Sequence, residues 1–194
     1  MTQQAADPIR QAQDYLRHLA AKGFPELGEQ MRRTAADWQR CLEGMSEEQA
    51  LHQPSPDPSA PGGPATGEGP KWCAKEVIGH YLSGERGLNR SVAVIAGVPP
   101  PDPTVPYVTR MGEQSTDDQA QPIDELRRRL AAFFEETIAF LDDLEKSDSL
   151  DGTFPHPVFG PLNAKEWIAF HRLHAMDHIQ QIDKIKADPG FPSA

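Results

Sequence analysis

The chain of 194 residues lacks the features that mark several common classes of protein. It has two cysteines, Cys41 and Cys73, without CxxC spacing, so neither a zinc knuckle nor a disulfide framework is indicated. No run of Lys or Arg exceeds the three arginines at 127–129, and the formal net charge is −10. Electrostatic binding to a phosphate backbone is therefore unfavourable, and we expect no nucleic-acid partner.

Long hydrophobic runs are also missing. Nowhere do about eighteen apolar residues follow one another, as a membrane-spanning helix requires. The first residues, Met-Thr-Gln-Gln-Ala-Ala-Asp-Pro, have no basic start followed by an apolar run. With so few cysteines, these features lead us to expect a cytoplasmic, soluble protein without a membrane partner.

Proline is plentiful instead, with 19 residues that cluster mostly in two stretches. These stretches predict long loops at 53–70 and 97–119, the second of which exceeds the usual connection and suggests a functional or crossover role. The length suits one domain, which we expect to span 1–194 with a core at about 26–187.

Apolar residues at helical spacing dominate the rest of the chain, and neither a strand pattern nor an internal repeat is evident. A short helix is expected at the N-terminus, and four long amphipathic helices follow: 8–21, 26–45, 74–96, 123–144 and 163–187. Asn163 is a suitable N-cap, with Glu166 at the capping-box position, and residues 154–162 before it are extended and turn-rich. The pattern predicts an all-α four-helix bundle with long loops and an extra short N-terminal helix.

Histidines are the strongest indication of function. His174 and His178 are one helical turn apart, so their imidazoles project from one face, about 5–6 Å from each other. They can bind one metal ion but cannot complete its shell. His80 lies on the apolar stripe of a separate helix, and helical bundles build metal sites from facing helices. A shared metal held by this trio would keep a coordination position open for chemistry.

Two other histidines complicate this interpretation. His171 lies three residues before His174 on the same face, so the pair could be His171 with His174, and periodicity leaves both choices open. His156 stands between two prolines and could reach the mouth of the site, but an exposed loop residue is the more common case.

Several segments together resemble the DinB superfamily, a family of four-helix bundles that includes bacillithiol- and mycothiol-dependent S-transferase-like proteins. Residues 72–85 place a tryptophan before a helix that carries His80, with a glutamate five residues on. Residues 159–167 precede a last helix that reads His-x-x-x-His at 174–178, followed by an amide and an aliphatic residue. The resemblance runs from about residue 26 to residue 185.

Carried over to this sequence, the resemblance implies metal ligands at His80, His174 and His178, and so decides against His171. Gln181 occupies the amide position of the family pattern.

Two acidic residues accompany these ligands. Glu85 matches the acidic position of the family pattern, but its angular offset from His80 argues against a ligand role and favours the surface or a place behind the ligands. Asp177 could accept a hydrogen bond from an imidazole, and a solvated helix position is an equal alternative.

A divalent metal held by three neutral imidazoles can acidify a bound water or thiol. Thiol S-transfer, with a low-molecular-weight thiol, or hydrolysis of a small molecule would follow. Imidazole suits Zn, Ni, Fe and Cu, with Mn also considered, so the pattern does not choose the metal. A non-enzymatic, metal-stabilised binding or stress-response module is the alternative, and a metal-free hydrophobe carrier ranks below both. A homodimer is expected from the resemblance and from the frequency of symmetric dimers.

Overall fold

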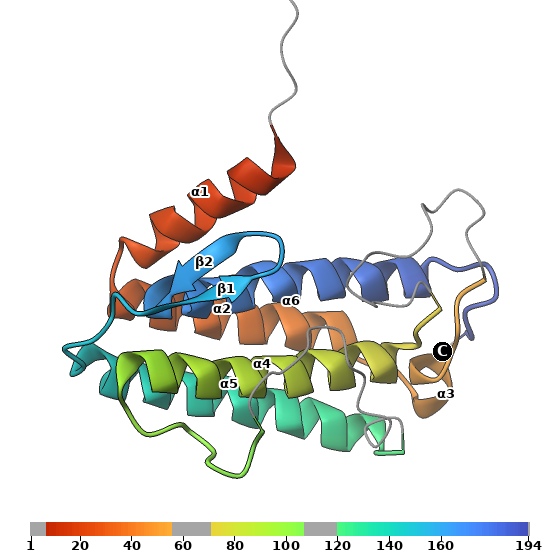
Figure 1. The fold of residues 1–194 in the computed structure, drawn as a ribbon. Helices are drawn as coiled ribbons and strands as arrows, with labels where there is room; N and C mark the ends of the chain where they lie inside the picture. Colours follow the sequence, from red (N-terminus) through yellow and green to blue (C-terminus); the bar gives the residue numbers. More distant parts are fainter. Residues whose placement is uncertain (1–6, 56–70, 107–119, 194) are drawn as a thin grey trace, which may run out of the picture.

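The structure, a computed structural model, describes residues 7–55, 71–106 and 120–193. Four long helices of this described part lie side by side, and shorter elements surround them (Figure 1). In chain order the elements are α1 (Pro8–Ala20), α2 (Phe24–Leu42), α3 (Glu47–Ala50), α4 (Ala74–Ala96), α5 (Ile123–Glu145), β1 (Thr153–His156), β2 (Gly160–Asn163) and α6 (Ala164–Lys186).

The long helices α2, α4, α5 and α6 form a closed bundle. Helix α6 packs against α2 and α4, and α5 packs against the same two helices on its own side. Helix α1 leans against α6 at an angle to the bundle, as Figure 1 shows. The predicted all-α bundle with an extra N-terminal helix is therefore confirmed.

Local sequence signals explain most helix boundaries. The side chain of Asn163 accepts a hydrogen bond from the backbone N–H of Glu166, whose side chain accepts from the N–H of Asn163, so the expected capping box begins α6. The expected start of α2 near Glu26 was slightly wrong. Helix α2 begins at Phe24 with Pro25 in its first turn, where the missing N–H of proline costs no hydrogen bond.

We expected no strands from the sequence, and this prediction was also wrong. Strands β1 and β2 form an antiparallel hairpin in which Thr153 pairs with Asn163 and His156 pairs with Gly160. Phe154 stacks on Trp167 with ring centroids 4.1 Å apart, and its carbonyl accepts a hydrogen bond from the indole N–H. The hairpin is held by this tertiary contact, which no alternation in the four-residue strands could reveal.

The predicted loops lie partly outside the described residues. Residues 53–55 and 97–106 contain neither helix nor strand, in line with the prediction, whereas 56–70 and 107–119 are not described. The single domain expected at 1–194 stays a prediction.

The buried apolar side chains divide into two clusters along the bundle. One cluster gathers around Trp38, Tyr81 and Phe133 and includes the C-terminal half of α6. The other gathers around Leu27 and Trp167 and includes residues of α1 and the hairpin. Between them the four helices place buried polar residues, namely Thr34, Glu85, Asn89, Thr137 and His171. This polar layer crosses the core at its middle.

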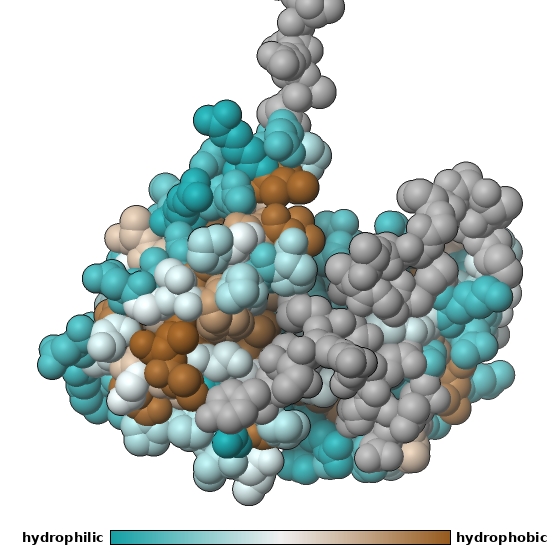
Figure 2. All heavy atoms as spheres, in the orientation of Figure 1, coloured by the Kyte–Doolittle hydropathy of each residue, from teal (hydrophilic) through white to brown (hydrophobic). Residues whose placement is uncertain are grey.

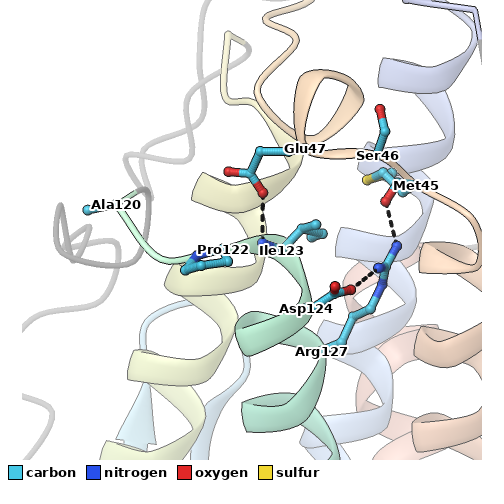
Figure 3. A pocket seen from close by; sticks show the side chains of 8 residues that line it. All are labelled: Met45, Ser46, Glu47, Ala120, Pro122, Ile123, Asp124 and Arg127. Atoms are coloured by element: carbon cyan, nitrogen blue, oxygen red, sulfur yellow. Dashed lines mark hydrogen bonds and ion pairs between the residues drawn. The ribbon is translucent and has the colours of Figure 1, made fainter.

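The end of the bundle next to α3 is fixed by charged side chains (Figure 3). Glu47 accepts hydrogen bonds from the backbone N–H of Ile123 and from Lys75, and the bond from Lys75 is the largest cause of its lowered pKa. Arg127 donates to the carbonyls of Leu42 and Met45. The pocket drawn in Figure 3 lies between these groups and is lined by none of the histidines.

The face of the molecule drawn in Figure 2 is mainly polar. Figure 2 shows hydrophilic and intermediate side chains over most of the described part of this face, with smaller hydrophobic patches between them. Among the described residues, no helix is long and apolar enough to cross a membrane.

Two glycines test the packing of the hairpin base. A Cβ at Gly152 would stand 2.8 Å from the carbonyl oxygen of Ile95, whereas a Cβ at Gly84 within α4 would meet nothing within 4 Å. We expect Gly152→Ala to lower the free energy of unfolding by about 1–3 kcal/mol, because backbone must move. Gly84→Ala should instead raise it by about 0.5–1 kcal/mol. Chemical denaturation measures both, and equal effects of the two substitutions would contradict the close approach.

Candidate metal centre

Three histidines from two helices meet inside the bundle. His80 comes from α4, and His174 and His178 come from successive turns of α6. One ring nitrogen of each lies within 4.8 Å of the corresponding nitrogens of the others. A zinc–nitrogen bond is about 2.0–2.1 Å, so nitrogens up to about 4 Å apart can share an ion, and side-chain shifts of about an ångström suffice. The donor set therefore fits a divalent transition metal.

Aromatic rings enclose the cluster. Trp72 packs on His80 with ring centroids 4.9 Å apart, and Phe170 stacks on His174 at 5.2 Å. His178 is fully buried, whereas the His174 side chain keeps 11% of its surface exposed. Among the three histidines, His174 is therefore the most accessible within the described part of the chain.

Glu85 connects the cluster to the polar layer. Its side chain is completely buried, with one carboxylate oxygen hydrogen-bonded to Nδ1 of His174 and the other to Nδ1 of His171. The surface alternative for Glu85 was therefore wrong, and its place behind the ligands is the one observed. The reason is the close packing of α4 on α6, which puts Glu85 opposite both histidines.

His171 faces away from the cluster, into the polar layer. Its Nε2 lies 2.8 Å from Oδ1 of Asn89, and the Asn89 amide donates to the hydroxyl of Thr137 at 2.8 Å. The Thr137 hydroxyl in turn donates to the carbonyl of Phe133, so it can only accept from Asn89, and the amide orientation is fixed. Nε2 of His171 consequently carries a proton.

The second nitrogen of His171 shares a proton with Glu85. Burial lowers the pKa of His171 to about 3, which disfavours a full charge on the imidazole. Yet Nδ1 faces a carboxylate oxygen, so one proton must lie in this hydrogen bond. A divalent cation held by His174 would favour the charge-separated form of the pair, with an imidazolium at His171 and an anionic carboxylate at Glu85 that accepts from Nδ1 of His174.

The hydrogen bonds on the far side of His174 and His178 fix their tautomers. Nδ1 of His174 faces Glu85, and Nδ1 of His178 lies 3.0 Å from the amide oxygen of Gln181, so both Nδ1 atoms donate. The proton-free Nε2 atoms of His174 and His178 then face each other at 2.8 Å. Each directs a lone pair toward a common point near His80.

The remaining candidate residues are less central. Gln181 supports His178 as described, while Asp177 is exposed on α6. Asp177 as a hydrogen-bond acceptor for an imidazole stays a prediction. Cys41 and Cys73 are buried free thiols, and burial raises the pKa of each to about 11, so both remain protonated.

The sequence favoured an exposed loop position for His156, and this expectation was wrong. His156 is the last residue of β1 and is 7% exposed, because the hairpin folds onto the aromatic side chains at the start of α6. Its ring lies 4.8 Å from Phe170, the residue that stacks on His174. Desolvation, and secondarily the nearby His174, lowers its pKa to about 4.

Sequence reasoning missed Asn89 and gave His171 no role beyond that of an alternative ligand. A signal was present, since Glu85 and Asn89 are four residues apart on α4 and share one helix face. Polar residues at that spacing within a buried stripe indicate a partner on the facing helix.

Replacing Glu85 tests its support of the cluster. Glu85→Gln keeps the shape and an acceptor for His174, but an amide cannot become anionic when a cation binds. We expect the dissociation constant for Zn²⁺ to rise roughly 10–100-fold, measured by competition with a chelator. Glu136→Gln, an exposed position on α5, is the matched control and should leave affinity unchanged. Equal affinities for the two variants would contradict the assigned role.

The depressed pKa of His156 predicts a pH dependence of stability. The folded imidazole takes up its proton near pH 4, whereas an ordinary histidine does so near 6.5. Between these values the unfolded chain binds more protons, so the free energy of unfolding should fall as pH drops from 6.5 to 4. His156→Asn should make this fall shallower in urea denaturation of metal-free protein. The exposed control His18→Asn should not, and a slope unchanged by His156→Asn would refute the prediction.

Comparison with known proteins agrees with this geometry. Among curated proteins no match is found. The profile of the DinB superfamily, however, matches residues 30–182, which include the three clustered histidines and most of each of the four long helices. A match over this much of the chain is decisive: the protein belongs to the DinB superfamily.

Proposed function

We propose that this protein is a metal-dependent enzyme that transfers a small-molecule thiol to an electrophile, with a divalent cation held by His80, His174 and His178. The observation that carries the proposal is the 2.8 Å approach of Nε2 of His174 to Nε2 of His178 while both Nδ1 atoms face hydrogen-bond acceptors. Two lone pairs directed at each other repel unless a cation lies between them.

The surroundings favour a metal ion over a proton as that cation. A proton could bridge two imidazoles, but it would not use a third, and the ring of His80 also converges on the pair, 5.1 Å from His178 and 5.7 Å from His174. The support from Glu85 and Gln181 is the carboxylate and amide pattern that orients metal-binding histidines.

A divalent cation with three neutral ligands keeps its full charge and an open position, so it can lower the pKa of a thiol or a water placed there. The protein groups nearby favour the thiol. Glu85 has both oxygens engaged, and burial holds the pKa of Tyr81 above its ordinary value, so neither serves as a base for hydrolysis. In thiol transfer a sulfur–carbon bond forms, the bond to the leaving group breaks with its electron pair, and the thiol proton goes to solvent.

The identity of the metal, among Zn, Ni, Fe, Cu and Mn, and that of the thiol form part of the test. Imidazole nitrogen is a suitable ligand for most of these ions. The homodimer, the cytoplasmic location and the small-molecule substrate stay predictions, and sedimentation measures the first.

Metal analysis of the purified protein tests the centre. We expect about one ion per chain, and His80→Ala, His174→Ala and His178→Ala should each weaken binding by more than the roughly 10–100-fold loss typical of residues behind the ligands. His18→Ala, which changes an exposed histidine on α1, should keep wild-type affinity. Far-ultraviolet circular dichroism checks that each variant remains helical. A wild type that binds no ion after reloading would overturn the proposal.

The activity is tested on the same proteins with 1-chloro-2,4-dinitrobenzene as electrophile and a panel of small thiols. Metal-loaded wild type should accelerate thioether formation, and chelator-treated wild type and His178→Ala should not. Spectra of the Co²⁺-loaded protein report whether a thiol reaches the ion. A bound ion whose spectrum no thiol alters would favour the non-enzymatic, metal-stabilised module instead.

A further inference from the structure

The tip of the hairpin holds one imidazole in a fixed tautomer. Nδ1 of His156 accepts hydrogen bonds from the backbone N–H groups of Val158 at 3.1 Å and Phe159 at 3.2 Å. An atom that accepts two hydrogen bonds carries no proton, so the proton of the neutral ring is on Nε2. The low pKa of His156 keeps the ring neutral at physiological pH.

The Nε2–H of His156 has no hydrogen-bond partner within the described part of the chain. Every hydrogen bond of this side chain there is made by Nδ1, although the residue is only 7% exposed. Phe159 stacks on the ring at a centroid distance of 4.5 Å and restricts its rotation. Nε2 itself is open to solvent, so a ligand oxygen can take the place of water at this fixed donor.

His156 also lies beside the metal centre. A single ring, that of Phe170, separates it from His174, with centroid distances of 4.8 Å to His156 and 5.2 Å to His174. His174 is the most exposed of the three clustered histidines, and its proximity contributes to the low pKa of His156. Figure 1 shows the hairpin lying against α6, the helix that carries His174.

We infer that His156 donates its Nε2–H to an oxygen acceptor, a carboxylate or a carbonyl, of the small molecule bound at the metal centre, with Phe159 and Phe170 as the aromatic walls of this subsite. The inference rests on the proposed function, because the metal anchors the other end of that molecule. His156 would thus position the substrate. It would also select small molecules whose oxygen acceptor lies at a set distance from the sulfur atom that binds the metal.

Two substitutions separate this role from that of the hairpin turn. Asparagine readily accepts a hydrogen bond from the N–H two residues on, so His156→Asn keeps the turn but removes the donor. His156→Gln does the reverse, because its longer amide can place an N–H near the position of Nε2 but lacks an acceptor at Nδ1. Melting temperature should therefore fall more for His156→Gln than for His156→Asn.

The probes are ω-mercaptocarboxylates from mercaptoacetate to 6-mercaptohexanoate, their methyl esters, and unsubstituted alkanethiols of the same lengths. All are titrated into Co²⁺-loaded protein and followed by visible absorption. The thiol anchors each probe on the ion, the chain length sets its reach, and the ester distinguishes a carbonyl from a charged carboxylate.

At the best chain length we expect wild type to bind the carboxylate or the ester roughly tenfold or more tightly than the alkanethiol. His156→Asn should lose this preference while keeping its Co²⁺ spectrum and its affinity for the alkanethiol. His156→Gln should keep part of the preference despite its lower melting temperature.

Three outcomes would overturn the inference. The donor role is refuted if His156→Asn still binds the carboxylate or the ester more tightly than the alkanethiol. It is also refuted if wild type binds all three kinds of thiol equally well. Both outcomes leave the metal-dependent function intact. A wild type that takes up no Co²⁺ refutes both the donor role and the proposed function.

Discussion

The buried carboxyl group of Glu85 is the constraint on which the core depends. It is completely removed from water, and its two oxygens join two histidines of α6 to α4. A buried carboxyl group without such partners would cost several kilocalories per mole, so α4 and α6 are held in one register, and another register would leave it unsatisfied. The same group fixes the tautomer of His174, so packing and chemistry depend on one side chain.

The polar layer explains how a helical bundle accommodates this group. The hydrogen bonds that start at His171 continue onto α5 through Asn89, Thr137 and the carbonyl of Phe133. Each side-chain polar atom in this series of hydrogen bonds therefore has a partner. Apolar clusters lie above and below the layer and shield it from water. Shielding strengthens the interactions within the layer, because the local dielectric constant is low.

Much of this arrangement could be predicted from the sequence, for physical reasons. Helices with apolar stripes and caps, such as the one that Asn163 begins, are encoded locally. His80 and the pair on α6 could be expected to meet because inward faces of neighbouring helices converge. The partners of His171 and the burial of His156 could not be predicted from the sequence, because both depend on which residues of distant segments come into contact. The hairpin is a third case, since it is stabilised by Trp167 and not by its own strands.

The 2.8 Å approach of two proton-free nitrogens has a consequence for folding. If the proposed cation binds between these nitrogens, it would turn an unfavourable contact into a favourable one, and its binding energy would add to the free energy of unfolding through mass action. The proportion of folded chains would then follow the free concentration of the metal. In a cell that clears unfolded chains, scarcity of the ion would lower the amount of this protein as well as its occupancy, so that abundance itself reports metal supply.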